Sequence, residues 1–205
     1  MTTESPPARA GRKGPLESFE RFMRTVRAAC ATPGGRAALR NGLADELASP
    51  WQLYMHLLPA GGIPAYASTR DAEVPYLLVA CLYAVHDAPN PRTAKTNPTP
   101  RAKPAEVWQN LGWSYACAVN TGVMRRANAA DALSHLAELG RDDLVRELPG
   151  AISLLRSQRI TVKWPVLLRD LTRWPKWADD VRIEWARAFY TPAARTTRTV
   201  EEKSK

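Results

Sequence analysis

The segment over residues 164–190, WPVLLRDLTRWPKWADDVRIEWARAFY, constrains the fold of this chain more than any other part of its sequence. Pro165 fits the first turn of a helix, where its missing amide proton costs no hydrogen bond. Pro175 ends that helix, because a proline pushes the residue before it out of the α region. A second helix then has Asp179 and Asp180 in its first turn, where the helix dipole favours negative charge. The segment therefore predicts a helical hairpin.

The tryptophans of this hairpin are predicted to form an aromatic seam, with arginines outside it. Apolar residues recur at helical spacing; they are Leu167, Leu168, Leu171 and Trp174 in the first helix, and Trp177, Val181, Trp185 and Ala188 in the second. Arg169 and Arg173 share the other side of the first helix, four residues apart. Like charges at this spacing repel each other mildly unless an anion lies between them. We therefore predict that the seam tryptophans are core residues and that the arginine pair contacts phosphate.

The rest of the chain also has the pattern of helices. Leu and Ala dominate its apolar residues, whereas Ile and Val never alternate with polar residues over a strand-length run. Residues 73–87, EVPYLLVACLYAVHD, are apolar nearly all round, which predicts a central buried helix. We therefore predict an all-α fold, a compact helical bundle of about eight to nine helices in two halves.

Composition divides the chain into five parts. Residues 1–14 are polar and basic and are expected to be disordered. Residues 15–87 and 105–190 are predicted to form the N-terminal and C-terminal helical halves, and residues 191–205 a polar tail. The segment 88–104 between the halves is rich in proline and lacks acids, so nothing in it offsets the entropy cost of ordering and we predict a partly extended loop. Its basic side chains are Arg92, Lys95, Arg101 and Lys103.

The charge balance points to a polyanionic partner. Lys and Arg outnumber Asp and Glu by 29 to 20, for a formal net charge of +9. Nucleic acid, an acidic protein and an anionic membrane surface all fit this excess. No membrane partner is expected, because no apolar run approaches the roughly 20 residues needed to cross one. The N-terminus lacks the apolar region of a secretory signal, and the three cysteines are far apart, so we expect a cytoplasmic protein without a disulfide framework.

No group of residues in the sequence is typical of a catalytic or metal site. The histidines are isolated, and the chain has neither a phosphate-binding glycine loop nor a serine elbow. The pairs Asp142-Asp143 and Asp179-Asp180 could in principle hold a metal ion, but adjacent helical side chains diverge by about 100°. Both pairs also fit the first turn of a helix. We therefore expect a non-catalytic binding protein with no cofactor, and a small helical enzyme is disfavoured.

The candidate binding residues are arginines in positions that a helix alone does not favour. Arg36 and Arg40 repeat the four-residue spacing found in the hairpin. Arg125 and Arg126 stand at a predicted helix start, where positive charge opposes the dipole. Each cluster alone fits a solvated helix face, but together they favour a surface that contacts phosphate. The complete predicted nucleic-acid-binding set is Arg36, Arg40, Arg92, Lys95, Arg101, Lys103, Arg125, Arg126, Arg146, Arg156, Arg169 and Arg173.

Several segments resemble the CasB family, the small subunit of the type I-E CRISPR surveillance complex Cascade. They are GRAALRNGL (35–43), VACLYAVHD (79–87), LGWSYACA (111–118) and, most clearly, 151–190 with its terminal W…WAR-aromatic pattern. The resemblance implies an all-helical, non-catalytic protein, present in two copies, that contacts the Cascade backbone and large subunits. It also implies that the protein braces the hybrid of crRNA and target DNA and holds the displaced strand.

Three positions depart from the family pattern, because Trp113, Ala129 and Pro149 stand where the resemblance implies basic side chains. The candidates to take over their role are Arg125, Arg126, Arg146 and Arg156. A helical transcriptional regulator that binds duplex DNA is the alternative function. Its recognition helix would start at Arg125-Arg126-Ala127-Asn128.

Overall fold

The computed structural model describes residues 14–44, 47, 51–58, 62–65, 67, 69–88 and 105–191, and these residues form eight α-helices and no strand. The helices are α1 (Glu17–Cys30), α2 (Pro33–Ala44), α3 (Trp51–Leu57), α4 (Arg70–His86), α5 (Leu111–Asn120), α6 (Arg126–Glu138), α7 (Arg141–Ser157) and α8 (Trp164–Tyr190). The predicted all-α class is confirmed. The expected disordered N-terminus, basic loop and polar tail lie, except for their edge residues, outside the described part of the chain.

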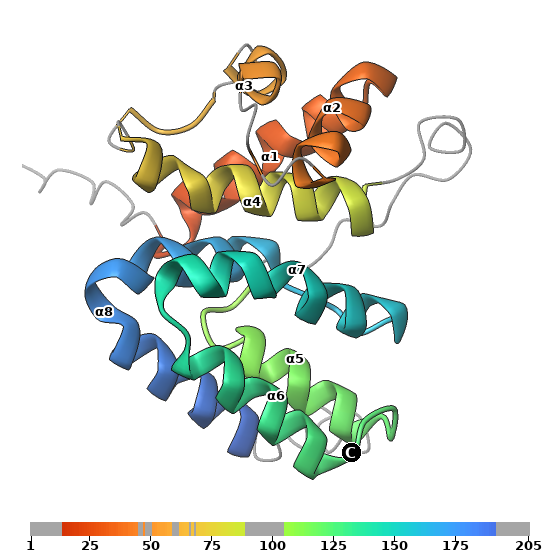
Figure 1. Ribbon diagram of the computed structural model, residues 1–205, viewed down its shortest axis with the longest axis vertical. Coiled ribbons are helices and arrows are strands. Elements are labelled where there is room, and N and C mark those ends of the chain that lie inside the picture. Colours follow the sequence, from red (N-terminus) through yellow and green to blue (C-terminus); the bar gives the residue numbers. More distant parts are fainter. Residues whose placement is uncertain are drawn as a thin grey trace, which may run out of the picture.

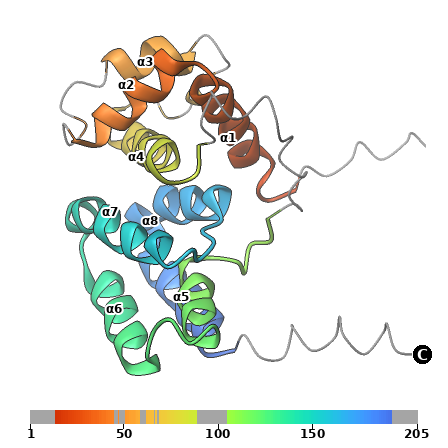
Figure 2. The same ribbon diagram turned by 90° about the vertical axis from the view of Figure 1, so that its right-hand side faces the viewer.

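Helix α4 lies at the centre of the molecule. Figures 1 and 2 show α1 to α4 gathered on one side, α5 and α6 on the other, and α7 with the first part of α8 between them. Helix α4 packs against α2 on one side and against α7 and α8 on the other. Its residues 75–84 are all buried, which confirms the predicted central helix. The helix begins earlier than predicted because the Thr69 hydroxyl accepts a 3.3 Å hydrogen bond from the amide of Ala72 and caps it.

The buried side chains form one contiguous core that draws on all eight helices. Cys30 and Cys81 belong to this core, while Cys117 is half-buried at its edge. Burial raises the pKa of the Cys81 thiol to about 12, so this side chain stays a neutral thiol at physiological pH. The cysteines therefore serve packing.

Helix α8 folds back on itself at a sharp kink. The backbone of Trp177 leaves the helical region (φ −135°, ψ 40°), two residues after the break expected at Pro175. The two limbs then meet, and the rings of Trp174 and Trp185 lie 5.1 Å apart between centroids. Both of these tryptophans are buried, but Trp177 is 52% exposed, so its assignment to the core is wrong. The non-helical dihedrals at Trp177 interrupt the helical phase, which separates its side chain from the face of Val181 and Trp185.

Helix α5 holds the second limb of α8 through an unusually close backbone approach. A Cβ added to Gly112 would lie 1.9 Å from the carbonyl oxygen of Trp185, so only glycine fits there. Asn110 caps α5 by accepting a 3.2 Å hydrogen bond from the Trp113 amide, and its Nδ2 donates a 3.1 Å bond to the Glu184 carbonyl. Helix α7 packs beside this unit and continues through Pro149 as one helix.

Candidate nucleic-acid interface

Arg169 and Arg173 are held inside the α8 hairpin by a carboxylate. Nη1 of Arg169 lies 3.0 Å from Oε2 of Glu184, and Nη1 of Arg173 lies 2.8 Å from Oε1. The arginine side chains are only 13% and 23% exposed. Burial raises the pKa of Glu184, but the hydrogen bonds from Arg173 and Arg169 outweigh it and leave this pKa below its usual range. The anion expected between the two arginines is therefore present, but it is Glu184 from the second limb.

Asp170 completes this network in the core. Its Oδ2 accepts a 2.8 Å hydrogen bond from Nε1 of Trp185, and its Oδ1 lies 3.1 Å from Nη1 of Arg169. The side chain is fully buried, and this burial raises its pKa to about 7 even though the Trp185 hydrogen bond and the Arg169 charge lower it. The two limbs of α8 are thus joined by the hydrogen bond between the buried side chains of Asp170 and Trp185.

Arg156 is a second predicted site residue that forms internal contacts. Its guanidinium pairs with the carboxylate of Asp87 and donates a 2.7 Å hydrogen bond to the Ile160 carbonyl. Nε1 of Trp164 donates a 2.6 Å bond to the other oxygen of Asp87. The end of α4 is thereby tied to α7 and to the start of α8. Arg146 differs, because its side chain is 70% exposed and its ion pair, at 3.2 Å, is with the exposed Asp143.

The remaining predicted residues lie on separate parts of the molecule. Arg36 is half-buried and Arg40 exposed on α2, whereas Arg125 and Arg126 are exposed at the start of α6. In both views α4 lies between α2 and α8, so the structure does not bring the α2 pair and the α8 pair together (Figures 1 and 2). The four loop residues, Arg92, Lys95, Arg101 and Lys103, fall outside the described residues.

Sequence reasoning missed Arg182, which joins α6 to α8. Its guanidinium donates to the carbonyls of Ala137 and Leu139 at the end of α6, pairs with Asp179 at 2.7 Å, and lies 5.4 Å from the centroid of the Trp174 ring. Carbonyls at the end of a helix are natural partners of an arginine. The i, i+3 spacing from Asp179 was visible in the sequence, but the contact with α6 depends on the tertiary fold.

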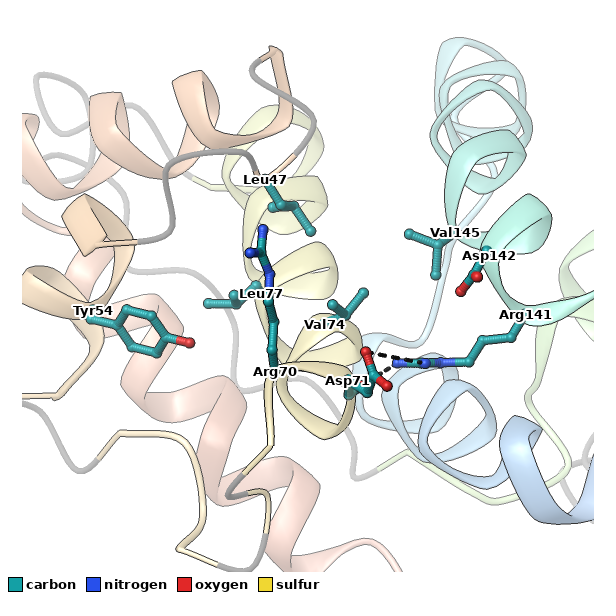
Figure 3. A pocket seen from close by; sticks show the side chains of 9 residues that line it. All are labelled: Leu47, Tyr54, Arg70, Asp71, Val74, Leu77, Arg141, Asp142 and Val145. Carbon is teal, nitrogen blue, oxygen red and sulfur yellow. Dashed lines mark hydrogen bonds and ion pairs between the residues drawn. The ribbon is translucent and has the colours of Figure 1, made fainter.

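A shallow pocket of about 190 Å³ lies between α3, α4 and α7 (Figure 3). Arg141 points across it to the carboxylate of Asp71 and also donates to the Asp71 carbonyl. Arg70 and Asp142 line the same pocket, so two positive and two negative side chains face it. These charges balance, and the pocket is not built to hold an anion.

The described residues contain no cluster of three or more His, Cys, Asp or Glu side chains placed to hold a metal ion. In the same ranges, none of the helices combines the length and the apolar character needed to cross a membrane. Arg40, Arg125 and Arg126 are exposed, and a guanidinium group is of a kind that can contact phosphate.

Comparison with known proteins relates the chain to one family and one fold. Residues 35–190 match the family described as CRISPR-associated protein Cse2. A chain of a pre-nicking CRISPR RNA-guided surveillance complex is 26% identical with a TM-score of 0.65, over 93% of this chain and 99% of that chain. CasB from M. ruber is 25% identical with a TM-score of 0.62, over 95% and 100% of the two chains. No curated protein sequence matches the chain.

Proposed function

Because this chain belongs to the CRISPR-associated Cse2 family, we propose that it is the non-catalytic small subunit of a type I-E Cascade complex in antiviral defence. There it contacts the backbone and large subunits and a second copy of itself. It stabilises the hybrid of crRNA and target DNA, together with the displaced DNA strand. The observation that carries this proposal is the family match over residues 35–190, joined to a similarity that spans 99% of a chain from a surveillance complex.

The division of labour in an RNA-guided complex explains why this subunit needs charge and no base-reading groups. Guide pairing reads the target sequence, and the protein only has to hold an R-loop whose formation is nearly balanced in free energy. Arginines can hold the R-loop through phosphate contacts, which position a strand and carry no sequence information. An arginine remains protonated at neutral pH and exchanges no proton with a substrate. We therefore assign the subunit a binding role without turnover.

The exposed arginines are the better candidates for phosphate contacts. We assign such contacts to Arg40, Arg125 and Arg126, with Arg146 and the half-buried Arg36 as further members. Arg156, Arg169 and Arg173 form internal ion pairs, so we assign them the role of fixing α7 and α8 in place. The loop residues Arg92, Lys95, Arg101 and Lys103 keep their proposed role as a weaker electrostatic layer.

Co-purification tests the proposal against the alternative of a DNA-binding regulator. The chain is co-expressed with the other subunits encoded beside it and with a CRISPR RNA, and the affinity tag is placed on a different subunit. The proposed function predicts that the chain elutes with that subunit and with RNA, at the mass of a large complex. Elution of the chain alone as a homodimer that protects a duplex DNA site from nuclease would contradict it and favour the regulator.

A further inference from the structure

The end of α8 and the start of α6 form an aromatic and cationic cluster of three residues. Phe189 is buried, and its ring meets the ring of Tyr190 edge to face, with 4.8 Å between centroids and an interplanar angle of 80°. The guanidinium carbon of Arg126 lies 5.7 Å from both ring centroids. Phe189 is anchored in the core, so it fixes the positions of the two exposed members, Tyr190 and Arg126.

Tyr190 itself contributes little to the core. Its side chain is 60% exposed, whereas the neighbouring Phe189 is 2% exposed. A single exposed aromatic side chain is common on protein surfaces, but this ring is held by an edge-to-face partner and by a guanidinium. Edge-to-face and cation–π contacts each favour one ring orientation. The cluster therefore presents an ordered flat ring to solvent, with a planar cation beside it.

The surroundings of this ring are positively charged. Arg125 precedes Arg126, and Arg187 lies one helical turn before Tyr190 on α8, so its side chain points to the same side. Both are exposed. In the part of the chain that the structure describes, neither these two arginines nor Arg126 forms an ion pair with an acid. This separates them from Arg169 and Arg173 of the α8 hairpin, which form ion pairs with Glu184.

We infer that Tyr190 and Arg126 form a stacking site for one base of a single-stranded nucleic acid, with Arg125 and Arg187 contacting the flanking phosphates. Unpaired bases stack on aromatic rings and guanidinium planes, whereas bases inside a duplex present no free face. Every base has such a face, so the site has little sequence preference. The identity of the bound strand rests on the proposed function: it is the displaced strand of the target DNA.

The test uses the assembled complex on target DNA and compares two displaced strands, one intact and one abasic throughout the R-loop. Tyr190→Ala should shorten the R-loop lifetime on the intact strand by at least about fivefold, the lower end of the loss for one base stack. On the abasic strand, Tyr190→Ala and wild type should give the same R-loop lifetime. Tyr190→Phe should give the wild-type lifetime on both the intact and the abasic strand. Arg125→Gln should instead reduce the slope of the logarithm of the binding constant against the logarithm of the salt concentration. The expected reduction is about 0.7 on either strand, as for one lost phosphate contact.

Three results would overturn the inference, and they can be told apart. If the wild-type subunit prolongs the R-loop but Tyr190→Ala performs as well on the intact strand, the stacking site is wrong and the proposed function stands. If Tyr190→Ala weakens binding equally on both strands, the ring acts through the fold or a protein contact and not through a base. If the complete complex holds the R-loop no longer than a complex without this subunit, the proposed function and the stacking site both fail.

Discussion

Nε1 of Trp185 donates a 2.8 Å hydrogen bond to Oδ2 of Asp170, and this bond joins the two limbs of α8 at residues fifteen positions apart. Both side chains are fully buried. Asp170 also meets Arg169 at 3.1 Å, and the guanidinium of Arg169 continues to Glu184 on the second limb. A buried carboxylate is costly unless its oxygens find partners. The hairpin is therefore fixed by a buried polar network as well as by the packing of its tryptophans.

The buried Asp170 should make the stability of the fold depend on pH. Its pKa is raised from 3.8 to about 7 in the folded state, so the folded protein holds this proton more tightly than the unfolded chain. The stabilising contribution of the protonated group is complete below the unfolded pKa and is lost as pH rises toward about 7. We predict that Asp170 lowers the free energy of unfolding by about 1 kcal/mol for each pH unit in the middle of this window.

The measurement is denaturant unfolding of wild type and Asp170→Asn at several pH values between 4 and 8. The asparagine keeps an oxygen for Trp185 but cannot titrate. Every other group cancels in the difference between the two proteins, so wild type should lose stability relative to the variant as pH rises. A difference that stays constant over this range would show that Asp170 is ionised throughout, held so by Arg169.

The close approach of α5 and α8 predicts strong selectivity for glycine at position 112. Gly112→Ala places a methyl group against the Trp185 carbonyl, so the helices must separate, and we expect a loss of about 1–3 kcal/mol or more. Gly150→Ala is the matched control, because nothing lies within 4 Å of a Cβ there. That control should raise the stability by about 0.5–1 kcal/mol through helix propensity. Equal effects of the two substitutions on melting would contradict the described packing.

The tryptophan at the kink and the buried tryptophan of the second limb should differ in their effect on stability. Trp185 is fully buried and Trp177 is 52% exposed. We predict that Trp185→Ala lowers the free energy of unfolding by about 3–5 kcal/mol, as for other buried aromatic residues. Trp177→Ala should change it by less than about 0.5 kcal/mol. Urea unfolding followed by circular dichroism measures both, and a large loss for Trp177→Ala would place that ring in the core after all.

Two arginines of α7 should likewise separate into a structural one and a surface one. Arg156→Gln leaves Asp87 without its charged partner in a half-buried site, which should cost roughly 2 kcal/mol of stability. Arg146→Gln removes an ion pair whose side chains are 70% and 56% exposed, and should cost less than about 0.5 kcal/mol. Thermal melts of the two variants at one ionic strength check this. The reverse order of effects would mean that the Arg156 contact is absent in solution.

Local patterns in the sequence were sufficient to predict the helices and the central position of α4. A helix that is hydrophobic on every face is stable only inside the core, so the apolar run over residues 73–87 was enough to predict where α4 lies. Pro175 similarly predicted the reversal in α8. The side chain of Trp177 could not be placed in this way, because its position depends on dihedral angles at the kink that helical periodicity does not describe.

The residues that pair with the arginines could not be predicted from helical spacing. Arg173 and Glu184 are eleven residues apart, so they share no turn of a helix and meet only because the hairpin closes. A signal was present, since positions 169 and 184 lie at nearly equal distances on either side of a break near residue 177, and these two residues form an ion pair. A buried Asp170 was unexpected because acids are almost never fully buried without a partner. The Tyr190 cluster was missed because cation–π contacts between α6 and α8 leave no sequence periodicity.

We propose that this subunit stabilises the R-loop through exposed arginines, and the affinity of the reconstituted complex for target DNA across a salt series measures that contribution. The complete complex is compared with a complex lacking the subunit and with one carrying Arg40→Gln and Arg125→Gln. We predict that omission weakens binding and that the double variant lowers the salt slope by about 0.7–0.9 for each lost phosphate contact, without changing sequence preference. An affinity and a slope that are identical in all three complexes would show that the subunit does not stabilise the R-loop through these arginines.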